Sequence, residues 1–161
     1  MPITLKTAQK VINIKLQEIV DRQKQAIINT LLYIGEQCVN HARSLPSPSL
    51  ADFPDPNNVP PHQPNYIDRT ANLRNSIGYA VICDGEIIQN YFDSQPSSEG
   101  SSKGNEAILS IAKKYQTGYV LCVVAGEKYG IYVTEKGYDV IDSATIIGEK
   151  LANQLIPSIK L

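Results

Sequence analysis

The sequence predicts an α+β domain in which a small antiparallel sheet of two hairpins packs against a long N-terminal helix and a C-terminal helix. Apolar residues recur at steps of three and four residues over residues 8–43 and again near the C-terminus. Between these segments lie four short apolar runs, paired across turns that contain glycine. With 161 residues, the chain has the length of one domain, 1–161, that can bury a sizeable core.

The first predicted helix covers residues 8–43, and no proline interrupts it. Its apolar stripe consists of Ile12, Leu16, Ile19, Val20, Ile27, Leu31, Ile34, Cys38 and Ala42. At ~1.5 Å per residue this helix is roughly 50 Å long, which exceeds what a domain of this size needs. We therefore expect part of it to contact a neighbouring subunit. Gly35, its single glycine, is the candidate position for a kink.

A proline-rich loop or arm is predicted over residues 44–67. Seven of the ten prolines fall between Pro46 and Pro64, and proline has a fixed φ and no amide donor. A loop of this length is unusual inside a compact domain. Two interpretations stay open: a flexible insertion, or an arm that becomes ordered against a partner.

Three local elements are expected next. A short helical turn covers Arg69–Ser76, and a strand follows near Ile77–Cys83. Asp84-Gly85 is a strong hairpin signal, with Glu86–Tyr91 as the returning strand. Residues 93–104 are rich in serine and glycine and are predicted to be a loop.

The C-terminal third is expected to begin with a short helix over Glu106–Tyr115. Tyr119–Ala125 is almost entirely apolar and predicts a central strand covered on both faces. Tyr129–Thr134 is the predicted last strand, in which Tyr129 and Tyr132 point to opposite faces. Asp142 or Ser143 is expected to cap a final helix that ends near Ile159.

Composition argues against several classes of function. Charged residues make up 19% of the chain and the net charge is −1, which does not suggest a nucleic-acid clamp. Three cysteines, without a Cys-x-x-Cys pair, favour free thiols in a reducing compartment. No charged segment leads into an apolar block, and no apolar run approaches ~20 residues. We therefore expect neither a signal peptide nor a membrane helix, and a protein made in a cytoplasm.

The chain offers little for catalysis or metal binding. Its two histidines are His41, three residues after Cys38, and His62 among the prolines. Two ligands do not make a metal site, and we expect neither a cofactor nor enzyme activity. The alternative is a small enzyme or ligand-binding domain with a pocket near Tyr129, Tyr132 and Glu135.

Two segments carry a resemblance to a known family. Thr70-Ala-Asn-Leu-Arg-Asn-Ser-Ile77 is similar to the Thr-Gly-x-Leu-x-x-Ser-Ile of phage tail-completion and head–tail connector (neck, minor tail) proteins. Ala71 stands where that family has glycine. Tyr129-Gly-Ile-Tyr-Val-Thr-Glu-Lys-Gly137 resembles the family's Tyr-Ala-x-Tyr-Val-Glu-x-Gly. Here Thr134 stands at the glutamate position, and Glu135-Lys136-Gly137 comes one residue late.

The resemblance implies a structural virion protein at the head–tail junction, assembled in the host bacterial cytoplasm. Such proteins form homo-oligomeric rings, here expected to be six- or twelve-fold, beside portal, adaptor or stopper and tail-tube proteins. Double-stranded DNA passes through the lumen without sequence-specific binding, and no cofactor or membrane is involved. A near-neutral charge suits this role, because a strongly basic lumen would bind the phosphates.

Residue roles follow from this interpretation. The structural signature consists of Thr70, Leu73, Ser76, Ile77, Tyr129 and Gly137. Thr70 is expected to cap the short turn, and Leu73 and Ile77 to enter the core. The candidate interface residues are Phe53, Tyr66, Arg69, Arg74, Tyr132 and Glu135.

Overall fold

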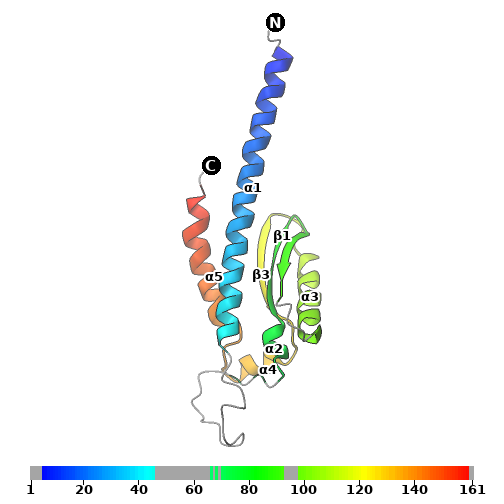
Figure 1. Ribbon diagram of the computed structural model, residues 1–161, viewed down its shortest axis with the longest axis vertical. Coiled ribbons are helices and arrows are strands. Elements are labelled where there is room, and N and C mark those ends of the chain that lie inside the picture. The colour runs from blue at the N-terminus through cyan, green and yellow to red at the C-terminus, as the bar shows by residue number, and fades with distance from the viewer. Residues whose placement is uncertain (1–4, 46–65, 67, 69, 93–97, 160–161) are drawn as a thin grey trace, which may run out of the picture.

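The computed structural model describes residues 5–45, 66, 68, 70–92 and 98–159. Figure 1 shows four layers side by side: a C-terminal helix, the long N-terminal helix, a sheet, and a shorter helix on the sheet's other face. The predicted α+β class is confirmed. The sheet has three strands instead of the two predicted hairpins.

The N-terminal helix α1, Leu5–Ser44, confirms the long helix and measures about 60 Å at 1.5 Å per residue. Its first half stands clear of the body in Figure 1, and every side chain over residues 9–22 is exposed. Its second half buries Ile34, Cys38 and Ala42. The helix runs on through Gly35, where a Cβ would overlap the ring of Tyr79 on the sheet. This glycine therefore allows a close approach of helix and sheet.

The antiparallel sheet has the order β2-β1-β3. Strand β1, Ile77–Cys83, is the most buried element, because it lies between two neighbouring strands with helices over both faces. Strand β2, Glu86–Tyr91, follows the predicted Asp84-Gly85 turn, whose φ angles of 50° and 84° fit a two-residue hairpin.

Strand β3, Tyr119–Ala125, has the predicted bounds but lies at an edge of the sheet, so its prediction as a central strand was wrong. Helices α1 and α3 contact it, which accounts for its apolar residues. Whether β3 lies at the centre or at an edge of the sheet depends on the topology, and its amino-acid composition does not reveal it.

Helix α3 covers Ser98–Ala112, so the loop predicted over 93–104 is wrong from Ser98 onward, and residues 93–97 lie outside the described part. Gly100 lies on the backbone of Asn72, and Gly104 lies against Phe92, so closely that a Cβ would clash. Tertiary contact at these glycines outweighs their low helix propensity.

Helix α4, Gly130–Glu135, replaces the predicted strand Tyr129–Thr134. Tyr129 and Tyr132 consequently do not lie on opposite faces of a strand. The helix ends in a Schellman motif, in which Gly137 has a φ of 84° and its amide donates to the Thr134 carbonyl at 2.8 Å. A β-branched and aromatic run predicts a strand only if a partner strand is available, and here the chain turns into a helix instead.

Helix α5, Asp142–Leu155, packs along α1 and ends in a 3-10 turn, Ile156–Ser158. The carboxylate of Asp139 accepts from the amide of Ser143 at 3.2 Å, so Asp139 serves the helix start that was assigned to Asp142 or Ser143. The Ser143 hydroxyl also lies 2.8 Å from His41 Nε2, which joins α5 to α1. None of the helices in the described ranges is both long and apolar enough to cross a bilayer.

Candidate interface at the signature turn

Residues 70–77, here called the signature turn, form the short helix α2, Asn72–Asn75, and its flanks. Leu73 and Ile77 are fully buried, which confirms their predicted place in the core. Ala71 has a φ of 58° and a ψ of 9°, in the left-handed region. This conformation costs an L-residue other than glycine about 1–2 kcal/mol. The strained alanine occupies the position at which the resembled family has glycine.

Ser76 is a buried hydrogen-bonding centre of the signature turn. Its hydroxyl donates to the Leu73 carbonyl at 2.7 Å and accepts from the Glu127 amide at 3.2 Å. Its carbonyl accepts from the Gly126 amide at 3.1 Å. One serine therefore closes α2 and fastens it to the loop that follows β3.

Tyr129 brings the second motif onto the first. Its phenol group lies within hydrogen-bonding reach of the Thr70 side chain and the Leu73 backbone. Burial raises the pKa of Tyr129, and these two hydrogen bonds act in the opposite direction. The next residue, Gly130, lies against Leu73: a Cβ added at Gly130 would lie 3.1 Å from Leu73 Cδ1, which is a tight contact. The two motifs form one packed unit.

Two side chains accept hydrogen bonds from backbone amides of the signature turn. The Asn72 amide donates to the Thr70 hydroxyl over 3.4 Å, two residues on as predicted, but the N-cap position of α2 is held by Ala71. The Arg74 amide makes the shorter bond, 2.7 Å, to the carboxylate of Asp68. Asp68 belongs to neither of the two motifs. Its position two residues before Thr70 is the only sequence signal that could have indicated its role.

Tyr66 was a predicted interface residue, but the structure places it in the core with 6% of its surface exposed. Burial, and secondarily the nearby carboxylate of Asp68, raises the pKa of Tyr66. The ring therefore anchors the end of the proline-rich segment instead of lying on a free surface. Phe53 and Arg69, also predicted for the interface, lie outside the described residues.

Glu127 is a buried acid that belongs to none of the predicted sites. It is 5% exposed, and both carboxylate oxygens lie 3.1 Å from Lys103 Nζ. Lys103 Nζ also lies 2.9 Å from the exposed carboxylate of Glu99. The hydrogen bonds to Glu99 and Glu127 raise the pKa of Lys103, and the bond to Lys103 lowers the pKa of Glu99. No local pattern marks Glu127, because its partner comes from α3.

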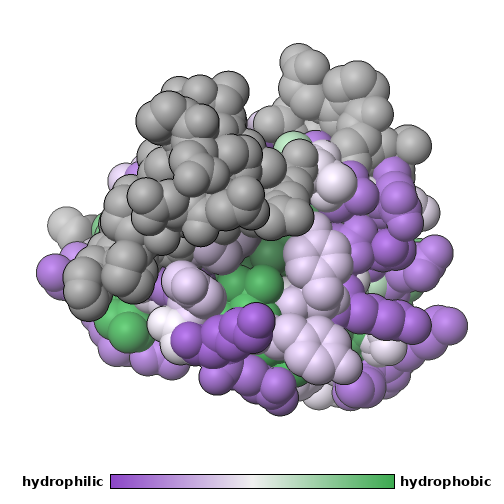
Figure 2. All heavy atoms as spheres, turned by 90° about the horizontal axis from the view of Figure 1, so that it is seen from below, coloured by the Kyte–Doolittle hydropathy of each residue, from purple (hydrophilic) through white to green (hydrophobic). Residues whose placement is uncertain are grey.

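The end of the molecule at α4 presents an exposed, partly aromatic face, here called the α4 face. Figure 2 views the molecule from this end and shows apolar atoms beside aromatic rings, bordered by polar side chains. The exposed large apolar side chains of α4 and its flanks are Tyr129, Ile131, Tyr132 and Tyr138. Among the predicted interface residues in the described ranges, Tyr132 is 68% exposed, and Arg74 and Glu135 are exposed as well.

The alternative prediction placed a ligand pocket near Tyr129, Tyr132 and Glu135. A hollow of about 280 Å³ does lie beside Glu135, but neither tyrosine lines it. Its volume is just below the ~300–1,000 Å³ usual for small-molecule sites. Glu127 also lines the hollow, with its carboxylate held by Lys103. Within the described ranges, no group of three or more His, Cys, Asp or Glu side chains is placed to hold a metal ion.

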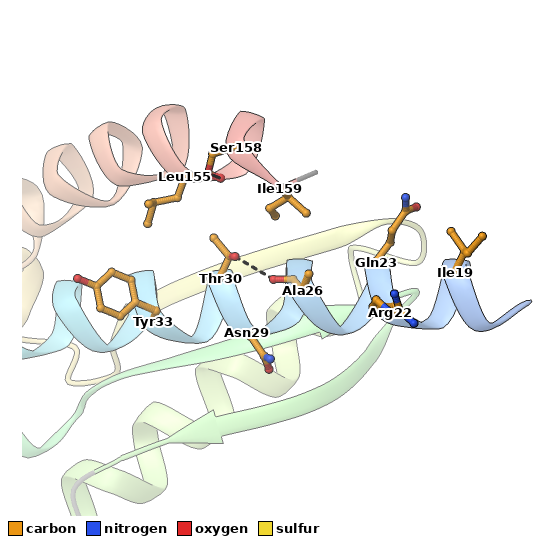
Figure 3. Close-up of a pocket in the computed structure, with 10 residues that line it drawn as sticks. All are labelled: Ile19, Arg22, Gln23, Ala26, Asn29, Thr30, Tyr33, Leu155, Ser158 and Ile159. Atoms are coloured by element: carbon orange, nitrogen blue, oxygen red, sulfur yellow. Dashed lines mark hydrogen bonds between the residues drawn. The ribbon is translucent and has the colours of Figure 1, made fainter. Parts of the chain in front are cut away.

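A larger groove, about 800 Å³, runs between α1 and the C-terminal end of α5 (Figure 3). None of the predicted site residues lines it, and the periodicity of α1 alone could not have located it, because its second wall comes from residues 155–159. Comparison of the chain with protein-family models, with curated proteins and with solved structures gave no match in any of the three.

Proposed function

We propose that this chain is a structural subunit of a phage neck, a tail-completion or head–tail connector protein that forms a ring. The genome passes through the lumen, and the ring contacts portal, adaptor or stopper and tail-tube proteins in the virion. The observation that supports this best is that the two motif segments, far apart in sequence, meet where the Tyr129 hydroxyl binds the signature turn. Weak matches that arose by chance would have no reason to lie together.

The strained backbone of Ala71 gives independent support. The resembled family has glycine at this position, and glycine is the residue that adopts a positive φ without cost. Here alanine keeps a φ of 58°. A fold that demands this backbone geometry explains both the family's glycine and the strain in this chain.

The distribution of exposed surface also suits a ring. Closed rings use heterologous contacts, in which two different surfaces of each subunit meet. The α4 face and the free half of α1 lie at opposite ends of the molecule in Figure 1 and both expose apolar side chains. The net charge of −1 leaves little attraction for the phosphates of a passing duplex.

The test is the mass and shape of the purified protein over a range of concentrations. Light scattering should give a six- or twelve-fold multiple of 17.7 kDa, and negative-stain electron microscopy should show rings. Ile131→Asp, at a site that is 65% exposed, should weaken assembly and leave melting unchanged. Lys128→Asp is the matched control, because it adds the same side chain just before the exposed apolar part of α4.

A protein that stays monomeric at every concentration would contradict the ring. Saturable binding of a small ligand, abolished by Glu135→Gln, would then favour the enzyme or ligand-binding alternative. Retention of one DNA sequence over others at physiological salt would likewise count against a passive lumen.

A further inference from the structure

The groove between α1 and α5 has a regular floor. Its α1 wall contains the row Ile19, Gln23, Ala26, Thr30 and Tyr33, which follows the alternating four- and three-residue spacing of helix-packing seams, and Arg22 and Asn29 lie beside this row. Figure 3 shows Thr30 facing Leu155 and Ile159 at the end of α5, with Gln23 and Ile19 on the same side of α1 beyond that end. The Thr30 hydroxyl donates to the Ala26 carbonyl at 2.8 Å, so this polar group has a hydrogen-bond partner within α1 itself.

The same row continues beyond the end of α5, onto the half of α1 that stands clear of the body. Leu16 and Ile12 extend the spacing, and they are 56% and 57% exposed. Val11, Ile14 and Val20 expose further apolar surface around this free end, at 43–51%. A helix with apolar residues on several sides is normally buried by packing against other helices.

We propose that the free end of α1, residues 9–22, docks into the α1–α5 groove of a second copy of this chain. The fully exposed segment and the groove floor, residues 19–33, are both about 20 Å long at 1.5 Å per residue. The tip and the groove adjoin along α1 and share Ile19 and Arg22, and the apolar row has the same spacing in both. The row itself holds no charged side chain, and among the groove residues only Arg22 is charged, so no charge is buried at the centre.

The area of such a contact is that of a weak interface. One half of a helical cylinder ~11 Å wide and ~21 Å long, the length of residues 9–22, presents roughly 360 Å². With the opposing groove wall, each contact removes roughly 700 Å² from water, so a single contact is weak and repetition around a closed ring strengthens it. Because tip and groove are different surfaces, the contact is head-to-tail and can close a ring. The inference deepens the ring proposal: it rests on self-association, and it does not depend on the place of the ring in a virion.

Two matched pairs of variants test the contact. On the tip, Ile12→Asp is compared with Asn13→Asp, its exposed neighbour outside the row. In the groove, Ala26→Arg is compared with Gln25→Arg, an exposed residue on another side of the helix. Sedimentation velocity should show the dissociation constant of self-association rising at least tenfold for Ile12→Asp and Ala26→Arg and changing less than twofold for the controls. Circular dichroism melting verifies that each variant is folded.

Cysteine cross-linking separates a tip in a groove from paired tips. In a Cys83→Ser background, Ile12→Cys and Gln23→Cys chains are mixed and oxidised, because Cys38 and Cys122 are buried. Dimers that form in the mixture and not in either variant alone support the proposal. Dimers of Ile12→Cys with itself would show that tips pair with each other and would overturn it. If the chain self-associates and none of the four substitutions changes the dissociation constant, the groove contact is rejected and the ring proposal is retained. If the unchanged chain is monomeric, both are rejected.

Discussion

The hydroxyl oxygen of Ser76 accepts a hydrogen bond from the Glu127 backbone amide at 3.2 Å, and both residues are buried. The bond links the turn before β1 to the loop after β3. The same hydroxyl donates to Leu73 in its own turn. A small side chain that both donates and accepts is therefore required at this position.

Ser76→Ala should lower the free energy of unfolding by about 1–3 kcal/mol, because it leaves the Glu127 amide buried without this acceptor. Urea denaturation measures the change. Ser110→Ala, at an exposed site on α3, is the control and should stay within about 0.5 kcal/mol of the unchanged chain. Equal effects of the two substitutions would show that the Ser76 bond contributes nothing.

Ala71→Gly should leave stability unchanged or raise it by up to about 1.5 kcal/mol. Glycine relieves about 1–2 kcal/mol of left-handed strain and costs roughly 0.5–1 kcal/mol of backbone entropy. Ala71→Val should destabilise, since a β-branched side chain is disfavoured at positive φ. Ala107→Gly, inside α3, should lower stability and so serves as the contrast. The same loss at positions 71 and 107 would contradict the strain at Ala71.

Lys103→Met should lower the melting temperature, because the nearly buried Glu127 carboxylate loses the ammonium that faces it. Adding Glu127→Gln should recover part of the loss, since the amide carries no charge. Glu99→Gln removes the exposed partner of the same lysine and should have little effect. If the effects of Lys103→Met and Glu127→Gln on the free energy of unfolding simply add in the double variant, the two groups are not coupled.

Alkaline pH should destabilise the fold in part through Cys122. Burial raises the pKa of Cys122 from 9.0 to about 11, so between these values the unfolded chain loses a proton that the folded chain keeps. The unfolded state then binds fewer protons, and stability falls with rising pH by up to about 1.4 kcal/mol per unit for this group. Cys122→Ala should flatten the fall between pH 9 and 11, as measured by urea midpoints. Parallel curves for both proteins would exclude a contribution from this thiol.

The candidate site was only partly predictable from the sequence. The motif positions correctly indicated Leu73 and Ile77 as core residues, since their spacing of four places them on one side of a turn. They could not show that Tyr129 binds that turn, because the contact depends on α4 being a helix. Tyr66 was assigned to a surface from its place beside the prolines, but its ring is buried by elements distant in sequence.

Elements with strong local signals could be predicted from the amino-acid sequence. The apolar period of α1, the Asp84-Gly85 turn and the bounds of β1, β2 and β3 all follow from neighbouring residues, and the structure agrees with them. Contacts in the folded chain were needed to show that α4 is a helix, that α3 begins at Ser98, and that β3 lies at an edge. Short apolar runs and glycines are compatible with several conformations of nearly equal free energy. Contacts with distant residues, such as Gly104 with Phe92, then select one of them.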